Sequence, residues 1–427
     1  MSGLPILLGV ALLGAQVGPS AAGTQAGAAI AITGGTVHTG TGEVLEGATV
    51  LLEGGRIVAV GADVRVPAGA RRVDAAGKVV TPGLIDLNTQ VGLVEVSQVS
   101  ETRDGSLAGD PIRSAFRVTD GVNPLSTVIP LTRVDGVTTV LAVPGGGLIS
   151  GQSALLDLDG WTVEAMTAKA PAAMHAVVGR AALDEVGGSR GGVFLKLREV
   201  LDDARFYAQN RANFNRGASR DLAAHRLDLE ALLPVLDRSL PIAVRADRTS
   251  DILATLRLAR EYNLRLVLVS AAQGWMVADR IAAAGVPVIL QPLADLPYSF
   301  DEIGARLDNA ALLARAGVRV ALSSFDTHNA RNVRQSVGNA IAYGLPYADG
   351  LKSVTLTPAQ ILGVADRYGS LAPGKVANVV VWSGDPFELT TFAEHVFIRG
   401  IEVPDHDRQK ALTERYRTLD DLPPMYH

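Results

Sequence analysis

Polar side chains follow several short apolar runs of this sequence, at points where buried strands would end. They are Asn88 and Gln90 after Leu84-Ile85, Arg245 and Asp247 after residues 241–244, Ser270 at the end of 264–270, and Asp326 and His328 after 318–324. Barrel enzymes carry their chemistry at the carboxyl ends of strands. A guanidinium can hold a carboxylate through two parallel hydrogen bonds. The set therefore predicts a pocket for a small anionic or zwitterionic ligand.

Nucleophilic catalysis finds little support in the sequence. The chain has no cysteine, and no Gly-x-Ser-x-Gly elbow occurs in it. The polar residues also have structural interpretations. Arg245 can form an ion pair with Asp247 or Asp326, and Asp326 can cap a helix. Of the seven histidines, only His328 follows an expected strand end. No catalytic residue is assigned from these patterns.

Composition and charge narrow the class of protein. A net charge of -5 argues against a nucleic-acid partner, because nucleic-acid-binding proteins usually present a basic face. Without cysteine there are no disulfides and no thiolate metal sites. An apolar stretch over 4–17, followed by Ser20-Ala21-Ala22, predicts a signal peptide over 1–22 and a periplasmic or secreted protein, although no Lys or Arg precedes Arg56. No later run is long and apolar enough to predict a membrane span.

The order of elements predicts one composite domain and one large inserted domain. Short β-rich runs separated by glycine pairs occupy 28–80, and similar runs recur over 374–382 and 396–400. They predict a small β-sandwich built from 23–80 and 373–404. Between them, 81–372 alternates apolar strands with helices such as 249–262, which predicts an α/β fold with a covered parallel sheet, of the size of a (β/α)8 barrel. The charged tail over 405–427 predicts a surface helix that packs on the barrel or on a second subunit. Whether the chain forms a homo-oligomer is left open.

Four segments together resemble the amidohydrolase superfamily, in the branch of imidazolonepropionase. They are Pro82-Gly83-Leu84-Ile85-Asp86, Gly136-Val137-Thr138-Thr139-Val140, residues 356–364, and residues 369–378 with Gly374-Lys375-Val376-Ala377-Asn378. The resemblance covers most of the chain after residue 22. It implies a (β/α)8 barrel with a composite domain made from both chain ends, as the strand pattern also indicates.

The resemblance further implies a divalent metal site, and the sequence departs from it at each histidine ligand. The superfamily's His-x-His follows the first strand, where this chain has Asn88 and Gln90. The histidines of the fifth and sixth strands correspond to Arg245 and Ser270. The aspartate of the last strand corresponds to Phe325 or Asp326, and Lys196 lies in the region of the bridging lysine. Neutral amides and a permanent cation are poor substitutes for imidazole ligands.

Three functions remain open on this basis. The first is a superfamily member with a degenerate site that needs no cofactor and binds a ligand. The second is an active hydrolase of cyclic amides or small peptides, which holds one zinc or another divalent ion through Asp326, His328 and a further carboxylate. The third is a non-enzymatic scaffold subunit of the cell envelope.

Overall fold

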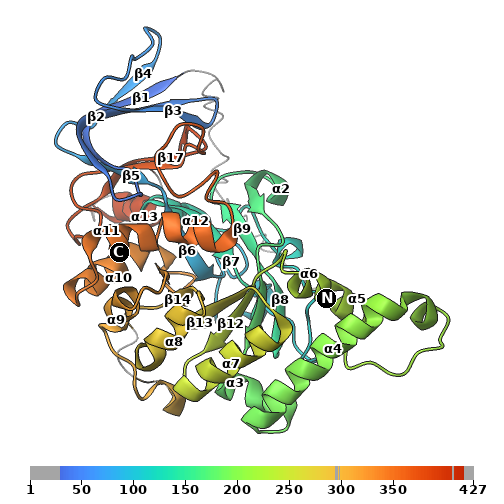
Figure 1. The fold of residues 1–427 in the computed structure, drawn as a ribbon. Helices are drawn as coiled ribbons and strands as arrows, with labels where there is room; N and C mark the ends of the chain where they lie inside the picture. Colours follow the sequence, from blue (N-terminus) through green and yellow to red (C-terminus); the bar gives the residue numbers. More distant parts are fainter. Residues whose placement is uncertain (1–28, 294–296, 298, 406–407, 418–427) are drawn as a thin grey trace, which may run out of the picture.

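The structure is a computed structural model that describes residues 29–293, 297, 299–405 and 408–417 (Figure 1). The expected signal peptide over 1–22 lies outside these residues. No helix in the described part has the length and apolar character to cross a membrane.

Strands from both chain ends form one sheet, as the sequence indicates. Its order is β18-β17-β16-β5-β1-β2-β3, with β4 paired to β1. The strands are β1 (Ile30–His38), β2 (Val44–Glu53), β3 (Arg56–Gly61), β4 (Arg71–Asp74), β5 (Val79–Pro82), β16 (Val379–Trp382), β17 (Ala393–Ile398) and β18 (Ile401–Glu402). The two ends meet where β16 runs antiparallel to β5. The hydrogen bonding gives one continuous sheet, so the division into the two sheets of a sandwich stays a prediction.

The inserted domain contains two further sheets. One has the order β10-β9-β7-β6 and the other β15-β14-β13-β12-β11-β8. Their strands are β6 (Leu84–Thr89), β7 (Val137–Ala142), β8 (Ile149–Gln152), β9 (Ala154–Asp157), β10 (Thr167–Lys169), β11 (Met174–Val177), β12 (Ile242–Ala246), β13 (Leu266–Ser270), β14 (Val288–Leu290) and β15 (Val320–Leu322). The pairs β6·β7 and β11 through β15 are parallel. By contrast, β8, β9 and β10 pair in antiparallel fashion, which interrupts the expected strand–helix alternation.

Side chains connect the two inner sheets where β6 lies next to β15. These two strands are not paired by backbone hydrogen bonds. The hydroxyls of Ser323 and Ser324 donate to the carboxylate of Asp86, and the Ser324 N–H lies 3.3 Å from Asp86 Oδ1. Asp86 is fully buried. This junction brings the first and last strands of the inserted domain together. Full closure into a barrel stays a prediction.

Helices cover the outer face of these sheets (Figure 1). They are α1 (Val128–Arg133), α2 (Val163–Met166), α3 (Arg180–Leu183), α4 (Arg190–Asn215), α5 (Arg226–Ala231), α6 (Leu233–Leu236), α7 (Thr249–Tyr262), α8 (Ala278–Ala283), α9 (Asn309–Arg315), α10 (Val333–Ala342), α11 (Tyr347–Ser353) and α12 (Leu356–Leu362). Helix α7 has the bounds expected from the sequence. It turns Ile252, Leu258 and Tyr262 inward, as an amphipathic helix on a sheet does.

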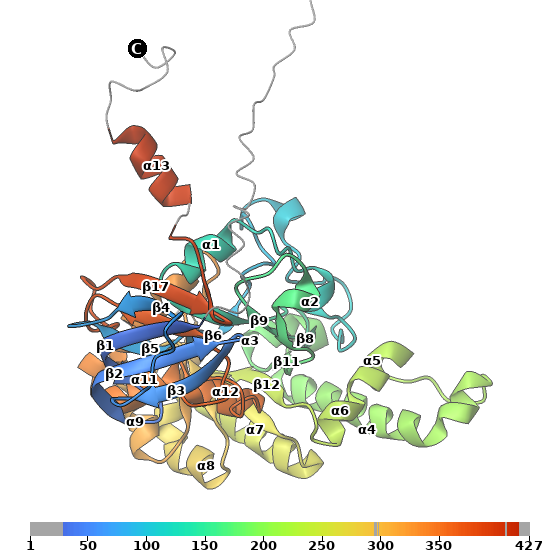
Figure 2. The same ribbon diagram turned by 90° about the horizontal axis from the view of Figure 1, so that it is seen from above.

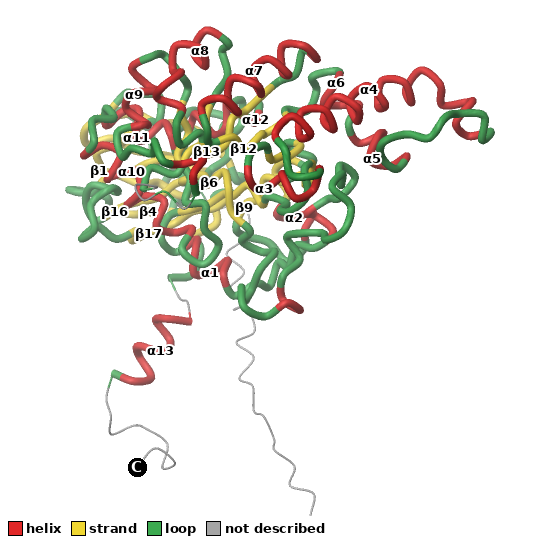
Figure 3. The backbone as a smooth tube through the Cα atoms, turned by 90° about the horizontal axis from the view of Figure 1, so that it is seen from below, coloured by secondary structure: helices red, strands yellow, loops and turns green. Residues whose placement is uncertain are grey.

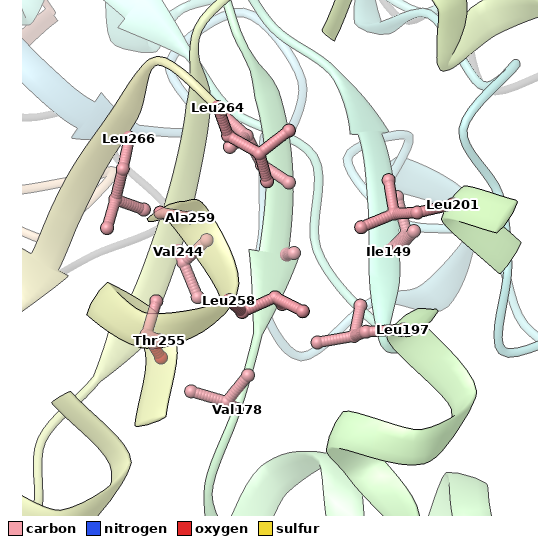
Figure 4. Close-up of a pocket in the computed structure, with 12 residues that line it drawn as sticks. Ile149, Val178, Leu197, Leu201, Val244, Thr255, Leu258, Ala259, Leu264 and Leu266 are labelled. Carbon is pink, nitrogen blue, oxygen red and sulfur yellow. The ribbon is translucent and has the colours of Figure 1, made fainter. Parts of the chain in front are cut away.

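The layer between these helices and the sheet is apolar and tightly packed. Figure 4 shows Leu201 of α4 beside Ile149 of β8, and Leu258 of α7 beside Val244 of β12, around the same small space. The space left between them is about 10 Å³, which is about the volume that one water needs. This layer is therefore hydrophobic core and not a ligand site.

Two elements project from the body. The outer part of α4, with α5, forms an arm (Figure 3), and the last buried residue of α4 is Tyr207. Helix α13 (Arg408–Tyr416) has no buried residue and extends away from the body (Figure 2). Gln409 Oε1 of this helix accepts a hydrogen bond of 2.9 Å from Arg331 Nη1 of the inserted domain. The expected surface helix is present, and its packing on the rest of the chain or on a second subunit stays a prediction.

Candidate functional site

A cavity of about 300 Å³ opens where the parallel strands of both inner sheets end. Asn88 and Thr89 come from β6, Val177 from β11, Arg245 from β12 and Val269 from β13. Its polar lining side chains are Asn88, Thr89, Gln90, Ser150, His175, Arg245, Asp326 and Thr327. Strands far apart in sequence meet here because parallel strands end on the same side of their sheet. Four of the seven residues expected from the sequence, namely Asn88, Gln90, Arg245 and Asp326, are brought together in this cavity.

The amides on β6 and after it hold the loops at the cavity mouth. Gln90 Nε2 donates to the carbonyls of Gly105 at 3.2 Å and Val143 at 3.4 Å. A Cβ on Gly105 would lie 2.5 Å from Gln90 Nε2, so glycine is required for this close approach. Asn88 is positioned by its own N–H, which donates to Asp86 Oδ1 at 3.3 Å. Gln90 therefore joins two loops, and Asn88 presents its amide to the cavity.

Arg245 forms ion pairs on the side of the cavity formed by β12. Its Nε lies 3.4 Å from Asp247 Oδ2, and its Nη2 lies 3.7 Å from Glu302 Oε1. The expected pairing with Asp247 is confirmed, the alternative with Asp326 is not found, and Glu302 was not anticipated. The Arg245 side chain is 47% exposed. It is therefore a solvated cation at the cavity wall, and not a buried charge that replaces a metal ion.

Asp326 lies in the cavity with different surroundings. Its carboxylate accepts hydrogen bonds from the N–H and the side-chain amide of Asn329, both at 3.1 Å. These bonds hold the turn before the short 3₁₀ helix Ala330–Asn332, whose N-cap is Asn329, so the expected role of Asp326 as a helix N-cap is not found, and the same residue lines the cavity. Within the part of the chain that the structure describes, no Lys, Arg or His lies within 4.0 Å of this carboxylate. Asp326 therefore offers a negative charge that has no cationic partner in the described residues.

The remaining expected residues do not line the cavity. Asp247 accepts from the Ala272 N–H at 3.2 Å in addition to its ion pair. Ser270 ends β13 with a φ of 71°, a left-handed conformation that is uncommon for residues other than glycine. His328 Nε2 lies 2.9 Å from the Glu95 carbonyl. Lys196 is on α4, 3.5 Å from Glu199. Asp247, Ser270 and His328 thus lie outside the lining of the cavity, and a role for them in ligand binding stays a prediction.

His175 was missed by the sequence analysis and lines the cavity from β11. It is 9% exposed, and its Nε2 is buried without a hydrogen-bond partner. Burial lowers the pKa of His175 to about 4, so the ring is neutral at pH 7. Its neighbours Met174 and Ala176 belong to the hydrophobic core. Successive side chains of a strand point to opposite faces, so His175 points away from the face of Met174 and Ala176. The sequence could have indicated this position through that alternation, but it did not predict a strand at β11.

The cavity holds one imidazole, that of His175, and one carboxylate, that of Asp326, among its lining side chains. Its side-chain donors at the superfamily's ligand positions are the amides of Asn88 and Gln90, and the guanidinium of Arg245 would repel a cation. Within residues 29–405, apart from the gaps at 294–296 and 298, and within 408–417, no group of three or more His, Cys, Asp or Glu is arranged to hold a metal. Of the pair expected to hold a single ion, Asp326 lines the cavity and His328 does not, so the mononuclear site stays a prediction.

Comparisons with known proteins agree with the motifs of the sequence. Residues 248–403 match the family described as "Amidohydrolase family". The chain is 25% identical over 365 residues to amidohydrolase tasK of Hapsidospora irregularis, a match that covers 78% of this chain and 37% of that protein. It is 28% identical to imidazolonepropionase of Ralstonia nicotianae, over 77% of this chain and 84% of that one.

Solved structures show the same fold. An amidohydrolase from Thermotoga maritima superimposes with a TM-score of 0.81 at 29% identity, and the match covers 88% of this chain and 99% of that chain. Molinate hydrolase, at 18% identity and a TM-score of 0.57, supports the fold alone.

Proposed function

Because this chain belongs to the amidohydrolase superfamily and is similar to imidazolonepropionase, we propose that it is a member with a degenerate metal site whose cavity binds a small zwitterion. On this proposal the two inner sheets are halves of one (β/α)8 barrel, and its mouth holds the ligand. The proposal extends to no named substrate of any relative.

One observation carries the proposal, namely that a cation and an unpaired anion line the same cavity. Arg245 and Asp326 both face a space of about 300 Å³, which lies at the lower end of small-molecule pockets. A ligand with a carboxylate and an ammonium group can bind both, and Asn88 lines the same cavity. Cavity size limits such a ligand to about the dimensions of an amino acid or a dipeptide.

Hydrolysis by a metal-activated water is the less supported candidate. That chemistry needs imidazole, carboxylate or carbamate donors around the ion, and amides and a guanidinium stand at the corresponding positions. Metal content of protein purified from the native host without chelator is the direct test. One zinc per chain at a site that depends on Asp326 would contradict the degenerate site and support the hydrolase.

A matched set of probes tests the ligand class by calorimetry on the full chain. Glycylglycine carries both charges, N-acetylglycine the anion, glycinamide the cation and N-acetylglycinamide neither. We expect glycylglycine to bind most tightly, with weaker binding after Arg245→Met or Asp326→Asn. Arg248→Met is the control, since Arg248 is exposed on the same loop and does not line the cavity. Equal affinity for all four probes, or no binding of any, would refute the proposal and favour the scaffold.

A further inference from the structure

A second cation lies behind the cavity wall, on the loop that connects β6 to α1. Arg113 is 5% exposed, and its Nε is buried without a hydrogen-bond partner. Among the described residues, no carboxylate lies within 4.0 Å of its guanidinium. A buried guanidinium without a counter-charge is costly, so buried charges are normally paired. Arg113 is therefore an uncompensated positive charge in the folded chain.

The guanidinium packs against glycine backbone that separates it from the cavity. Arg113 Nη1 would lie 2.7 Å from a Cβ on Gly146, and Arg113 Cζ would lie 3.3 Å from a Cβ on Gly147. Any side chain at Gly146 would displace the guanidinium. Gly145 and Gly146 line the cavity on its other side. No side chain of this loop therefore separates the charge of Arg113 from a ligand at the wall.

The same loop offers backbone donors. Gly146 and Gly147 have φ angles of 81° and 66°, a conformation open to glycine. The N–H of Gly145 donates to the Gly105 carbonyl at 2.8 Å. In the described residues, no protein acceptor takes the N–H of Gly146 or of Gly147. Successive free amides near a cation form the kind of concavity that binds anions.

We propose that this glycine wall, in which Gly145 and Gly146 line the cavity and Gly146 and the following Gly147 are backed by Arg113, is the anion subsite of the cavity and receives a carboxylate of the ligand. The proposal rests on the zwitterion-binding function. It deepens it by naming a second cation for the same carboxylate. Arg245 also pairs with Asp247 and Glu302, whereas Arg113 has no carboxylate partner among the described residues.

The test compares N-acetylglycine with N-acetylglycinamide, which differ in the charge of the carboxyl group. The wild-type chain should prefer the acid, and Arg113→Met should weaken acid binding by about tenfold or more with little effect on the amide. Arg113→Lys, which keeps the charge, should retain most of the preference. Arg117→Met is the matched control, because Arg117 is exposed on the same loop and pairs with Asp120.

A second measurement keeps the inference testable if Arg113→Met does not fold. In wild-type protein labelled with ¹⁵N-glycine, N-acetylglycine should shift the amide resonances of Gly146 and Gly147 and the amide probe should not. Unchanged resonances, or a preference for the acid that survives in Arg113→Met, would overturn the subsite. If glycylglycine fails to bind the wild type, the proposed function itself fails. If it binds and depends on Arg245 but not on Arg113, only the subsite is wrong.

Discussion

At the scale of single residues, Asp86 shows how a buried carboxyl can join two parts of a fold. It is the last residue of the Pro82-Gly83-Leu84-Ile85-Asp86 segment and accepts from both Ser323 and Ser324. Burial raises the pKa of Asp86 from 3.8 to about 6, and the serine hydrogen bonds oppose that rise. The fold therefore favours the protonated carboxyl.

This shift predicts a pH dependence of stability. Between about pH 4 and pH 6 the folded chain holds a proton that the unfolded chain has lost. The contribution of Asp86 is therefore fully present below pH 4 and falls as the pH rises to about 6, by about 3 kcal/mol. In Asp86→Asn, which keeps a polar partner for the serines, this fall should be absent. Urea unfolding of the wild type and of Asp86→Asn from pH 4 to pH 7 measures this fall. If the difference between their unfolding free energies is the same at every pH, the prediction is wrong.

Metal affinity is a second property decided by single residues. We expect Asn88→His with Gln90→His to bind no stoichiometric zinc, because the Arg245 cation remains in the cavity. Adding Arg245→His and Ser270→His should restore measurable zinc affinity, although the left-handed backbone at Ser270 must then orient the new ring toward the cavity. Elemental analysis of the purified variants decides this. One zinc per chain in the double variant would show that Arg245 does not prevent binding.

At the scale of elements, the composite sheet depends on contacts between the two chain ends. Trp382 of β16 is fully buried, and its Nε1 donates to Thr81 Oγ1 at 2.9 Å. Its ring packs on Gly136, where a Cβ would lie 2.2 Å away. Asn378 Nδ2 donates to the buried Asp157 at 3.0 Å. Asn378 therefore supplies an amide donor to a buried carboxylate and connects β16 to the inserted domain.

These contacts predict that the composite sheet and the barrel fold together. Removal of residues 372–404 should give insoluble protein, since β5 loses its neighbour β16 and the site of Trp382 is emptied. Removal from Asp405 onward is the control and should leave soluble protein with an unchanged melting temperature, because α13 buries no residue. Solubility and circular dichroism of both truncations provide the readout. If the protein without residues 372–404 is soluble and folded, the inserted domain folds without the composite sheet, and the prediction is wrong.

At the scale of the whole molecule, the α4–α5 arm and α13 both extend away from the body of the chain (Figures 2 and 3). Leu195 on α4 and Leu227 on α5 are exposed at 59% and 58%. Isolated exposed leucines are normal on a surface, so these elements do not by themselves predict an oligomer, and the homo-oligomer stays an open expectation.

Export is a prediction about the whole chain that depends on residues outside the described part. The apolar stretch over 4–17 and the small residues after it should direct cleavage near residue 22. Mass spectrometry of the N-terminus from the native host should find a chain that begins near residue 23, in the periplasmic or secreted fraction. An intact Met1 in the cytoplasmic fraction would contradict it.

The sequence by itself determined the fold class and four of the eight polar side chains that line the cavity. Its apolar runs and turn residues located β7, β12, β13 and α7 closely, because burial of a strand or a helix face is encoded locally. Asn88, Gln90, Arg245 and Asp326 could be predicted together, since parallel strands carry their last residues to one side of the sheet.

Only the tertiary structure decided the partners of these residues. Glu302 reaches Arg245, Arg113 lies under Gly146, and His328 turns to Glu95 because loops return to the barrel mouth along paths that no local pattern specifies. His175 was missed because β11 follows an antiparallel excursion that breaks the strand–helix rhythm. Local chemistry thus fixes which side chains stand at strand ends, while loop packing, which joins distant parts of the chain, decides which of them meet.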